Sequence, residues 1–216
     1  MAGLPAFLKL EDKKIAVIGG GSVASRKIRS LVEAGAEIVV ISPEINAGLE
    51  DMVEAGLLEW RQKSYEYGDL EGFWLAIAAT SDSSVNHQVY QEAKGLMQLY
   101  NIADRPDLST FYTAARVKKG DLQIAISTGG KAPALSAEIR RELADKFGDS
   151  FREYLEFTGE VREWLLENED SGERLRILRE MASPEILDSL LAGDLEEVLK
   201  ELEKTIPERF YNERAL

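Results

Sequence analysis

The chain has 216 residues, of which 44% are hydrophobic and 30% are charged, and its formal net charge is −13. This composition is typical of a globular protein with a sizeable core. The absence of cysteine excludes disulfides, zinc–thiolate sites, iron–sulfur clusters and thiol catalysis. No apolar stretch reaches the length of a membrane span, and the first residues lack the order of a signal peptide. We therefore expect a cytoplasmic protein that does not associate with membranes.

The negative charge is unevenly distributed along the chain. Residues 151–216 hold 18 acidic and 9 basic side chains, whereas residues 104–141 carry a net charge of +3. A small basic region in an acidic protein can steer an anionic ligand, but it is too small to indicate nucleic-acid binding. The alternative is a solvated surface with ordinary ion pairs.

The first hundred residues alternate between apolar strands and amphipathic helices. Strands are predicted at residues 14–18, 37–42, 57–61, 73–79 and 99–103, and helices after residue 21, at about 46–55 and at about 84–94. This alternation predicts a doubly wound parallel sheet of the Rossmann type.

The pattern changes in the second half of the chain. Strands at residues 110–117 and 122–127 are separated by four residues, which predicts a hairpin. A glycine-containing turn then leads into a helix that ends near residue 147, and the remainder is predicted to be helical. Ser183 and Asp194 are expected to start two of these helices.

These predictions give an α/β fold in three parts. We expect an NAD-binding Rossmann domain over residues 1–108, a dimerisation hairpin and helix over 109–149, and a helical domain over 150–216. The middle element is too small to be an independent domain, so its apolar face must be buried elsewhere. A second subunit is the expected place, which predicts a homodimer.

Residues 19–24 read GGGSVA and fit the pattern G-x-G-x-x-A between a strand and a helix. Gly19 would allow a tight turn, and Gly21 would let the backbone approach a pyrophosphate. The small side chain of Ala24 would let the helix pack closely against the strand. The amide groups at the helix start are then expected to bind phosphates. The alternative is a tight turn without a ligand.

The second strand ends at Ser42-Pro43-Glu44, where Rossmann proteins distinguish NAD from NADP. This segment contains no arginine or lysine that would bind a 2′-phosphate, and Glu44 would repel one. We therefore expect NAD as the cofactor, although the acidic residue is displaced from the usual strand end.

Six segments carry a resemblance to a known family. They are LPAFLKL (residues 4–10), IAVIGGGSVASRK (15–27), WLAIAATSDSSVN (74–86), YNIAD (100–104), STFYTAAR (109–116) and GDLQIAISTGGKAPALSAEIRREL (120–143). Together they resemble the precorrin-2 dehydrogenase / sirohydrochlorin ferrochelatase family, which includes the N-terminal module of siroheme synthase. The resemblance extends from residue 3 to about residue 150. It implies NAD-dependent oxidation of precorrin-2 to sirohydrochlorin. Many members also insert ferrous iron to give siroheme, whereas some lack this second activity.

The resemblance also assigns roles to single residues. Asp104 matches the family's key aspartate, which would act as general base in oxidation and in chelation. By the same matches, the cofactor is expected to contact Ser22, Val23, Pro43, Glu44, Thr80 and Asp82. The anionic tetrapyrrole is expected to contact Asn101, Thr128, Gly129 and Gly130, with the basic residues Arg116, Lys118 and Lys131 near its carboxylates. The alternative for Asp104 is that it caps the turn before Arg105.

Two departures from the family pattern bear on the substrate side. Ala114 stands where the family often has proline. Ala132, just before Pro133, stands where the family often has serine, so the tetrapyrrole-binding turn lacks that hydroxyl. His87 is the only histidine and is most simply an exposed helix residue, so we expect no resident metal site. Ferrous iron would then be a substrate of chelation.

Three other functions share part of this pattern. An NAD-sensing regulatory module would use the glycine turn without needing Asp104, and a relative that only chelates would bind sirohydrochlorin without NAD. A purely structural dimer module would explain neither motif.

Overall fold

The computed structural model describes residues 3–214, which divide into two compact units. Residues 6–113 form the first, called here the Rossmann unit, and residues 114–214 form the second, the C-terminal unit, together with residues 3–5. The predicted α/β class is confirmed, with a parallel sheet, a hairpin and a helical C-terminal part. The division into three domains at residues 108 and 149 stays a prediction.

The Rossmann unit contains a parallel sheet of five strands. These are β1 (Lys14–Ile18), β2 (Glu37–Ile41), β3 (Glu59–Arg61), β4 (Leu75–Ala78) and β5 (Leu99–Ile102), in the order β3-β2-β1-β4-β5. All four strand pairs are parallel. The strand order reverses between β1 and β4, and in open parallel sheets ligands bind at the carboxyl ends of the strands beside such a reversal.

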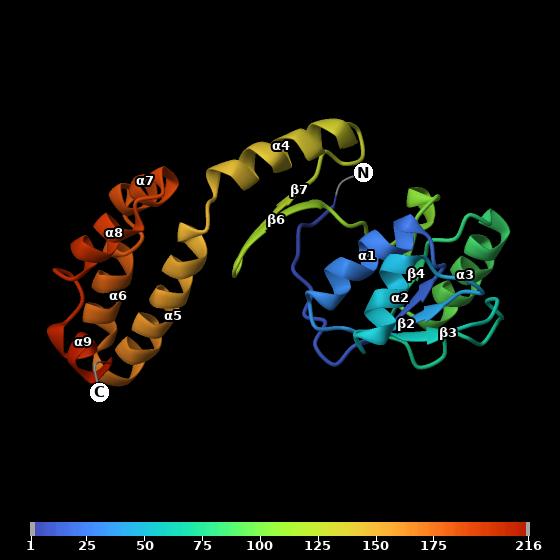
Figure 1. Cartoon of the computed structure of the whole chain (residues 1–216), viewed down its shortest axis with the longest axis horizontal. Helices are drawn as coiled ribbons and strands as arrows, with labels where there is room; N and C mark the ends of the chain where they lie inside the picture. Colours follow the sequence, from blue (N-terminus) through green and yellow to red (C-terminus); the bar gives the residue numbers. More distant parts are fainter. Residues whose placement is uncertain (1–2, 215–216) are drawn as a thin grey trace. The chain divides into compact units, whose positions relative to one another are not determined.

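Helices cover both faces of this sheet (Figure 1). The helices α1 (Ser22–Val32) and α2 (Ala47–Glu54) pack on one face, against Ile15, Val17 and Ile38. On the other face, α3 (Ser83–Leu96) packs against a second cluster that includes Ala16 and Ile18. Because both faces are buried, the central strands are continuous apolar runs, and this is the signal that identified them in the sequence.

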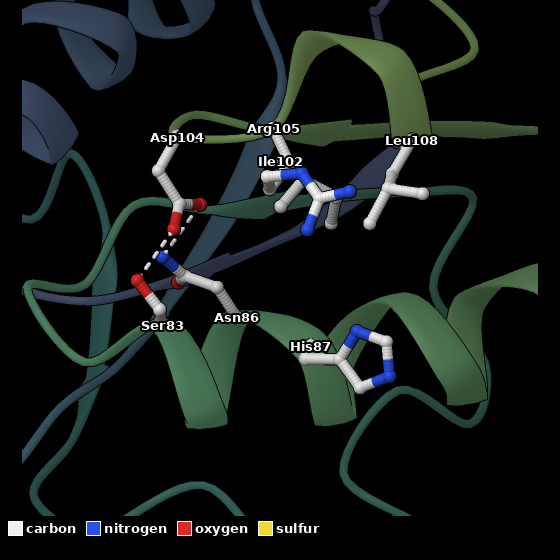
Figure 2. A pocket seen from close by; sticks show the side chains of 7 residues that line it. All are labelled: Ser83, Asn86, His87, Ile102, Asp104, Arg105 and Leu108. Carbon is white, nitrogen blue, oxygen red and sulfur yellow. Dashed lines mark hydrogen bonds between the residues drawn. The ribbon is translucent and has the colours of Figure 1, made fainter.

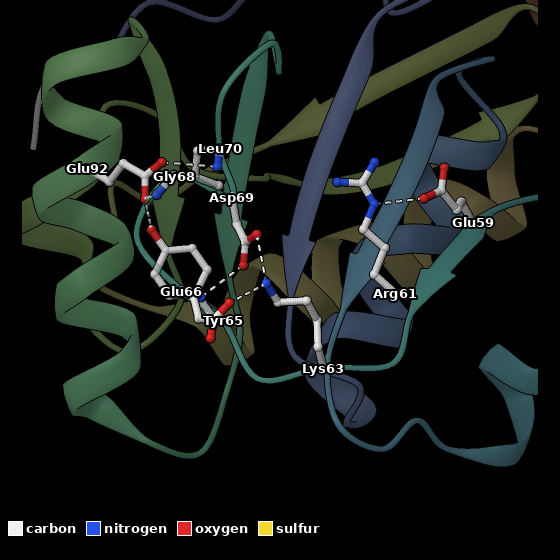
Figure 3. Close-up of polar contacts among 9 residues, drawn as sticks. All are labelled: Glu59, Arg61, Lys63, Tyr65, Glu66, Gly68, Asp69, Leu70 and Glu92. Carbon is white, nitrogen blue, oxygen red and sulfur yellow. Dashed lines mark hydrogen bonds and ion pairs between the residues drawn. The ribbon is translucent and has the colours of Figure 1, made fainter.

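The segment between β3 and β4 has no regular structure and is fixed to α3 by one buried carboxylate (Figure 3). Glu92 on α3 accepts hydrogen bonds from the backbone amides of Gly68 and Leu70, both at 3.0 Å, and from the hydroxyl of Tyr65. At the surface of the same segment, Lys63 forms ion pairs with Glu66 at 2.7 Å and Asp69 at 3.1 Å.

The strand expected at residues 110–117 begins only at Ala115 in the structure. A short 3-10 helix, η1 (Pro106–Leu108), follows β5, and residues 110–114 have no regular structure. The reason is that Thr110 bonds to the backbone of Tyr100 through its own amide and through its hydroxyl, at 2.9 to 3.2 Å. This segment therefore runs beside β5 in the Rossmann unit and does not extend the hairpin.

The C-terminal unit begins with the predicted hairpin. Strands β6 (Ala115–Lys119) and β7 (Leu122–Ile126) pair antiparallel, and α4 (Pro133–Lys146) packs on them. The helical remainder consists of α5 (Ser150–Asn168), α6 (Ser171–Glu180), α7 (Pro184–Ala192), α8 (Leu195–Leu202) and α9 (Glu208–Arg214). The predicted helix starts are confirmed, since Ser183 and Asp194 cap α7 and α8 by accepting backbone amide bonds.

The five C-terminal helices share one apolar core. Its buried members include Tyr154, Val161, Leu165 and Ile177, and the rings of Phe157 and Trp164 pack against it. Among the helices that the structure describes, none combines the length and the apolar character that crossing a membrane requires.

Candidate functional site

The turn after β1 has the geometry that the glycine pattern predicts. Gly19 has a φ of 113° and donates its amide to the carbonyl of Ile41 at 3.0 Å. A Cβ at Gly19 would lie 2.6 Å from the carbonyl oxygen of Ala79, which is closer than real side chains come. The position therefore requires glycine both for its backbone angle and for its contact with the end of β4.

Gly21 differs from Gly19 because nothing among the described residues demands a glycine there. Its φ of −85° is open to any residue, and a Cβ would meet no atom within 4 Å. The space beside Gly21 is therefore free for a ligand that approaches the backbone closely. Ser22 and Val23 are exposed at the start of α1, whereas Ala24 is fully buried against the sheet.

The N-terminus of α1 can accept an anion. No described side chain caps the helix, and its first turn contains no acidic residue. The first amide groups of a helix lack partners within the helix, and the helix dipole favours negative charge at that end. These amides, next to the open side of Gly21, form a site that fits a pyrophosphate.

The loop after β2 ends at the same edge of the sheet. The Ser42 hydroxyl donates to the carbonyl of Glu44 at 2.7 Å, and the indole of Trp60 donates to the carbonyl of Ser42 at 2.9 Å. These bonds fix the loop, while Pro43 and Glu44 remain exposed. The carboxylate of Glu44 therefore faces solvent just beyond the carboxyl end of β2.

The loop after β4 is held by its own side chains. Asp82 caps α3, accepting from the Ser84 hydroxyl at 2.6 Å and from the amides of Ser84 at 2.8 Å and Val85 at 3.4 Å, and these bonds lower its pKa. The Thr80 hydroxyl accepts from the amide of Asp82 at 3.1 Å. Both predicted cofactor residues thus shape the loop that lies next to the glycine turn.

Asp104 lies just beyond the carboxyl end of β5 and is exposed. One of its carboxylate oxygens accepts a hydrogen bond from Nδ2 of Asn86 at 2.9 Å, and the other accepts one from the Ser83 hydroxyl at 2.8 Å. Figure 2 shows both donors projecting from α3 toward the carboxylate. Among the described residues, the hydrogen bonds of this side chain lead to α3 rather than to the turn before Arg105.

A small pocket of about 140 Å³ opens beside Asp104. Its lining includes Ser83, Asn86 and His87 from α3, and Arg105 and Leu108 from the segment after β5 (Figure 2). Arg105 is paired with Asp107 at 2.7 Å, and the His87 ring lies beside Gln91. Within residues 3–214 no three histidine, cysteine or acidic side chains are grouped so that they could hold a metal ion.

Asn101 was expected to contact the substrate, and the structure places its side chain inside the Rossmann unit. The residue is 5% exposed, and its Nδ2 donates to the carbonyl of Phe111 at 2.9 Å. Its Oδ1 has no hydrogen-bond partner among the described atoms. The visible role of Asn101 is to tie β5 to the following segment, and its contact with a substrate stays a prediction.

The remaining predicted substrate residues belong to the C-terminal unit. Arg116 and Lys118 lie on β6, and the turn from Thr128 to Lys131 precedes α4. The Thr128 hydroxyl accepts from the amide of Ala132 at 3.1 Å and from the Ser136 hydroxyl at 3.2 Å. The alanine at position 132 gives α4 no side-chain cap of its own. That these residues meet the same ligand as Asp104 stays a prediction.

Comparison with known proteins identifies the family. A family model described as "Putative NAD(P)-binding" matches residues 6–115, about half of the chain. The chain belongs to this family. A second model, described as sirohaem biosynthesis protein central, matches residues 119–146.

Curated relatives support the resemblance seen in the sequence. The chain is 35% identical to siroheme synthase 3 of Aeromonas hydrophila over 193 residues, which is 88% of this chain and 41% of that protein. It is 31% identical to the siroheme synthase of Nitrosococcus oceani over 216 residues, 100% of this chain and 46% of that protein. The chain thus spans less than half of the length of these relatives.

A solved structure extends the similarity to the whole fold. A protein described as SirC, precorrin-2 dehydrogenase, aligns with a TM-score of 0.77 and 27% identity, covering 94% of this chain and 100% of that one. The family resemblance expected from the sequence is therefore confirmed.

Proposed function

We propose that this chain oxidises precorrin-2 to sirohydrochlorin with NAD as the hydride acceptor. The observation that carries the proposal is the arrangement at one edge of the sheet. An open glycine turn at the end of β1 and an exposed carboxylate at the end of β5 lie at the carboxyl ends of parallel strands. The names of the similar proteins supply the substrate class.

The cofactor would lie against residues of three neighbouring loops. The backbone beside Gly21 and the amides of Ser22 and Val23 would bind the pyrophosphate. Pro43 and Glu44 would lie near the adenosine ribose, where the negative charge of Glu44 favours NAD over NADP. Thr80 and Asp82 would line the cofactor on the side of β4. Bound NAD would supply the acceptor for the hydride.

Asp104 would act as the general base. The oxidation removes two electrons and two protons from the macrocycle: one proton leaves with both electrons as hydride, and the other must be taken up by a base. Asp104 is exposed, follows a strand at the ligand-binding edge, and has each carboxylate oxygen held by one donor. A carboxylate fixed in this way is oriented to receive that proton.

The carboxylates of the substrate would bind basic side chains, and the C-terminal unit contains the predicted ones. Arg116, Lys118 and Lys131 fall within the basic stretch of residues 104–141. They are proposed to bind the macrocycle's acidic side chains, together with the turn at Thr128, Gly129 and Gly130.

A homodimer is proposed as the working state. Along β7 the partly buried Leu122, Ile124 and Ile126 alternate with exposed Gln123 and Ala125. An edge strand of this kind is a template for pairing with another chain. Light scattering that gives twice the mass of 24.0 kDa would support the dimer, and a monomer at micromolar concentration would remove it.

The decisive experiment is anaerobic incubation with precorrin-2, with and without NAD, following sirohydrochlorin by absorbance. Product that appears only with NAD supports the oxidation. The Asp104→Asn variant should bind NAD as the wild type does and oxidise at least about a hundredfold more slowly, the usual contribution of a general base. NAD binding without any turnover would instead favour a regulatory module.

Ferrous iron, as a substrate, is added in a second stage of the same experiment. A faster absorbance change than the uncatalysed reaction would add iron insertion to the proposed function. Iron insertion without any use of NAD would identify a protein that only chelates. Asp104→Asn should slow iron insertion as well, if one carboxylate serves both steps.

A further inference from the structure

The side-chain amide of Asn86 is almost completely buried and has hydrogen-bond partners for both its N–H groups and its oxygen. Asn86 is 1% exposed and lies in the first turns of α3. Its Oδ1 accepts from the backbone amide of Thr80 at 3.2 Å and lies 3.0 Å from the Thr80 hydroxyl. Its Nδ2 donates to the carbonyl of Thr80 at 3.1 Å and to Asp104 at 2.9 Å. Both N–H groups of the amide therefore have acceptors, and its oxygen has a fixed donor in the Thr80 backbone.

These contacts also fix which way the amide faces. The backbone N–H of Thr80 can only donate, so the atom of Asn86 beside it must be the oxygen. The NH₂ group therefore points at Asp104 and can only donate to it. Asn86 thus presents a donor of fixed orientation to one carboxylate oxygen, while Ser83 supplies the donor for the other.

Ser83 and Asn86 reach the same carboxylate because they are three residues apart on one helix. Residues with this spacing lie on one face of a helix. Their side chains join Asp104, beyond β5, to the first turn of α3 and, through Asn86, to the loop after β4. The side chain of Asn86 therefore binds both the Thr80–Asp82 loop and the proposed base, Asp104.

We propose that Asn86 is the positioning residue for Asp104, with Ser83 as its second support, and that Asn86 couples the carboxylate to the Thr80–Asp82 loop. This inference rests on the proposed oxidation. A base that is fixed relative to the cofactor loop meets the substrate in one orientation, and misplacing a reacting group by about 1 Å can cost about a hundredfold in rate. The competing explanation is that Asn86 only closes the Thr80–Asp82 turn.

A double-mutant cycle separates these explanations. Asn86→Ser should lower kcat by about ten- to a hundredfold, and Ser83→Ala, at an exposed position where folding is not at risk, by about three- to tenfold. In the Asp104→Asn background the same changes should lower the remaining rate less than about threefold, because their target is already lost. Equal losses in both backgrounds would overturn the proposal.

Two further readouts accompany the cycle. NAD affinity and the KM for precorrin-2 should change by less than about threefold in Ser83→Ala, since a positioning residue acts on the chemical step. Gln88→Ala, an exposed change on the same helix, should leave kcat unchanged. A Ser83→Ala variant that loses NAD binding and keeps its kcat at saturation would contradict the assignment.

A measurement without substrate tests the contact itself. The side-chain NH₂ resonances of Asn86, assigned by their loss in Asn86→Asp, should shift in Asp104→Ala and stay in place in Asp107→Ala. Unshifted resonances in Asp104→Ala would overturn the proposal, whatever the enzyme does. If the Asn86 resonances shift in Asp104→Ala but the wild type never oxidises precorrin-2, the proposed function is wrong and the contact between Asn86 and Asp104 is still supported.

Discussion

The hydroxyl of Tyr65 donates a hydrogen bond to the carboxylate of Glu92, and both side chains are buried in the Rossmann unit. The same carboxylate accepts from the backbone of Gly68 and Leu70, so one side chain of α3 orders the segment that leads into the central strand β4. Burial, followed by the bond to Glu92, raises the pKa of the Tyr65 hydroxyl. The tyrosine therefore remains a donor at physiological pH.

Replacing Glu92 should be costly because, among the described residues, its three donors have no other acceptor. In Glu92→Leu the Tyr65 hydroxyl and the Leu70 amide would be left buried without partners, at about 1–3 kcal/mol each. We expect the free energy of unfolding, measured in urea, to fall by about 2–4 kcal/mol. The control is Glu66→Ala, which removes an exposed ion pair with Lys63 in the same segment and should cost less than about 1 kcal/mol. Similar losses in both variants would show that Glu92 is not the anchor.

The Tyr65 bond also predicts how stability depends on pH. A group whose pKa is raised by folding contributes stability that is complete below its unfolded pKa of about 10 and is lost as the pH rises above it. The wild type should therefore lose up to about 1.4 kcal/mol per pH unit more than Tyr65→Phe above pH of about 10. Urea unfolding of both proteins between pH of about 8 and 11 measures this difference. A constant difference across that range would contradict the raised pKa.

The sheet could be predicted because the signal of each strand lies within a few consecutive residues. Strands buried on both faces are continuous apolar runs, and β1 and β4 stand out in the sequence for that reason. The glycine turn was also predictable, since its spacing follows from one tight turn and one close approach to a ligand. The segment from Thr110 to Ala114 was predicted wrongly as strand, because hydroxyl-to-backbone bonds with Tyr100 replaced ladder pairing.

The partners of Asp104 could not be found in this way. Asn86 precedes Asp104 by 18 residues, and they meet only because β4 and β5 are neighbours in the sheet. No sequence periodicity or motif spacing predicts the contact between Asn86 and Asp104. The one available signal was that WLAIAATSDSSVN, which includes Ser83 and Asn86, belongs to the family resemblance.

The open side of Gly21 gives a sharp test of the cofactor site. A methyl group at Gly21 would lie more than 4 Å from any described atom outside its chain neighbours, and the backbone angles there suit alanine. Gly21→Ala should therefore change the free energy of unfolding by less than about 0.5 kcal/mol. Its methyl group would occupy the space through which a pyrophosphate approaches, so NAD affinity should fall at least about tenfold, or about 1.4 kcal/mol.

Calorimetric titration with NAD and urea unfolding check both halves of this prediction. The matched control is Gly95→Ala on α3, where a Cβ would also meet no atom within 4 Å, and which should bind NAD normally. Unchanged NAD affinity in Gly21→Ala would show that the dinucleotide lies elsewhere.

Glu44 provides the last prediction, on the choice between NAD and NADP. Its carboxylate is exposed after β2, in a segment that contains no cation, so a 2′-phosphate beside it would be repelled. One like-charge contact near a surface is worth about 1–1.4 kcal/mol, or about five- to tenfold in affinity. Glu44→Gln should therefore tighten NADP binding by about that factor and leave NAD affinity nearly unchanged. Because exposed charges are screened, the effect should shrink in 1 M salt. An unchanged ratio of NADP to NAD affinity would mean that Glu44 does not lie near the ribose, and the selectivity would then have to come from the shape of the Ser42–Glu44 loop.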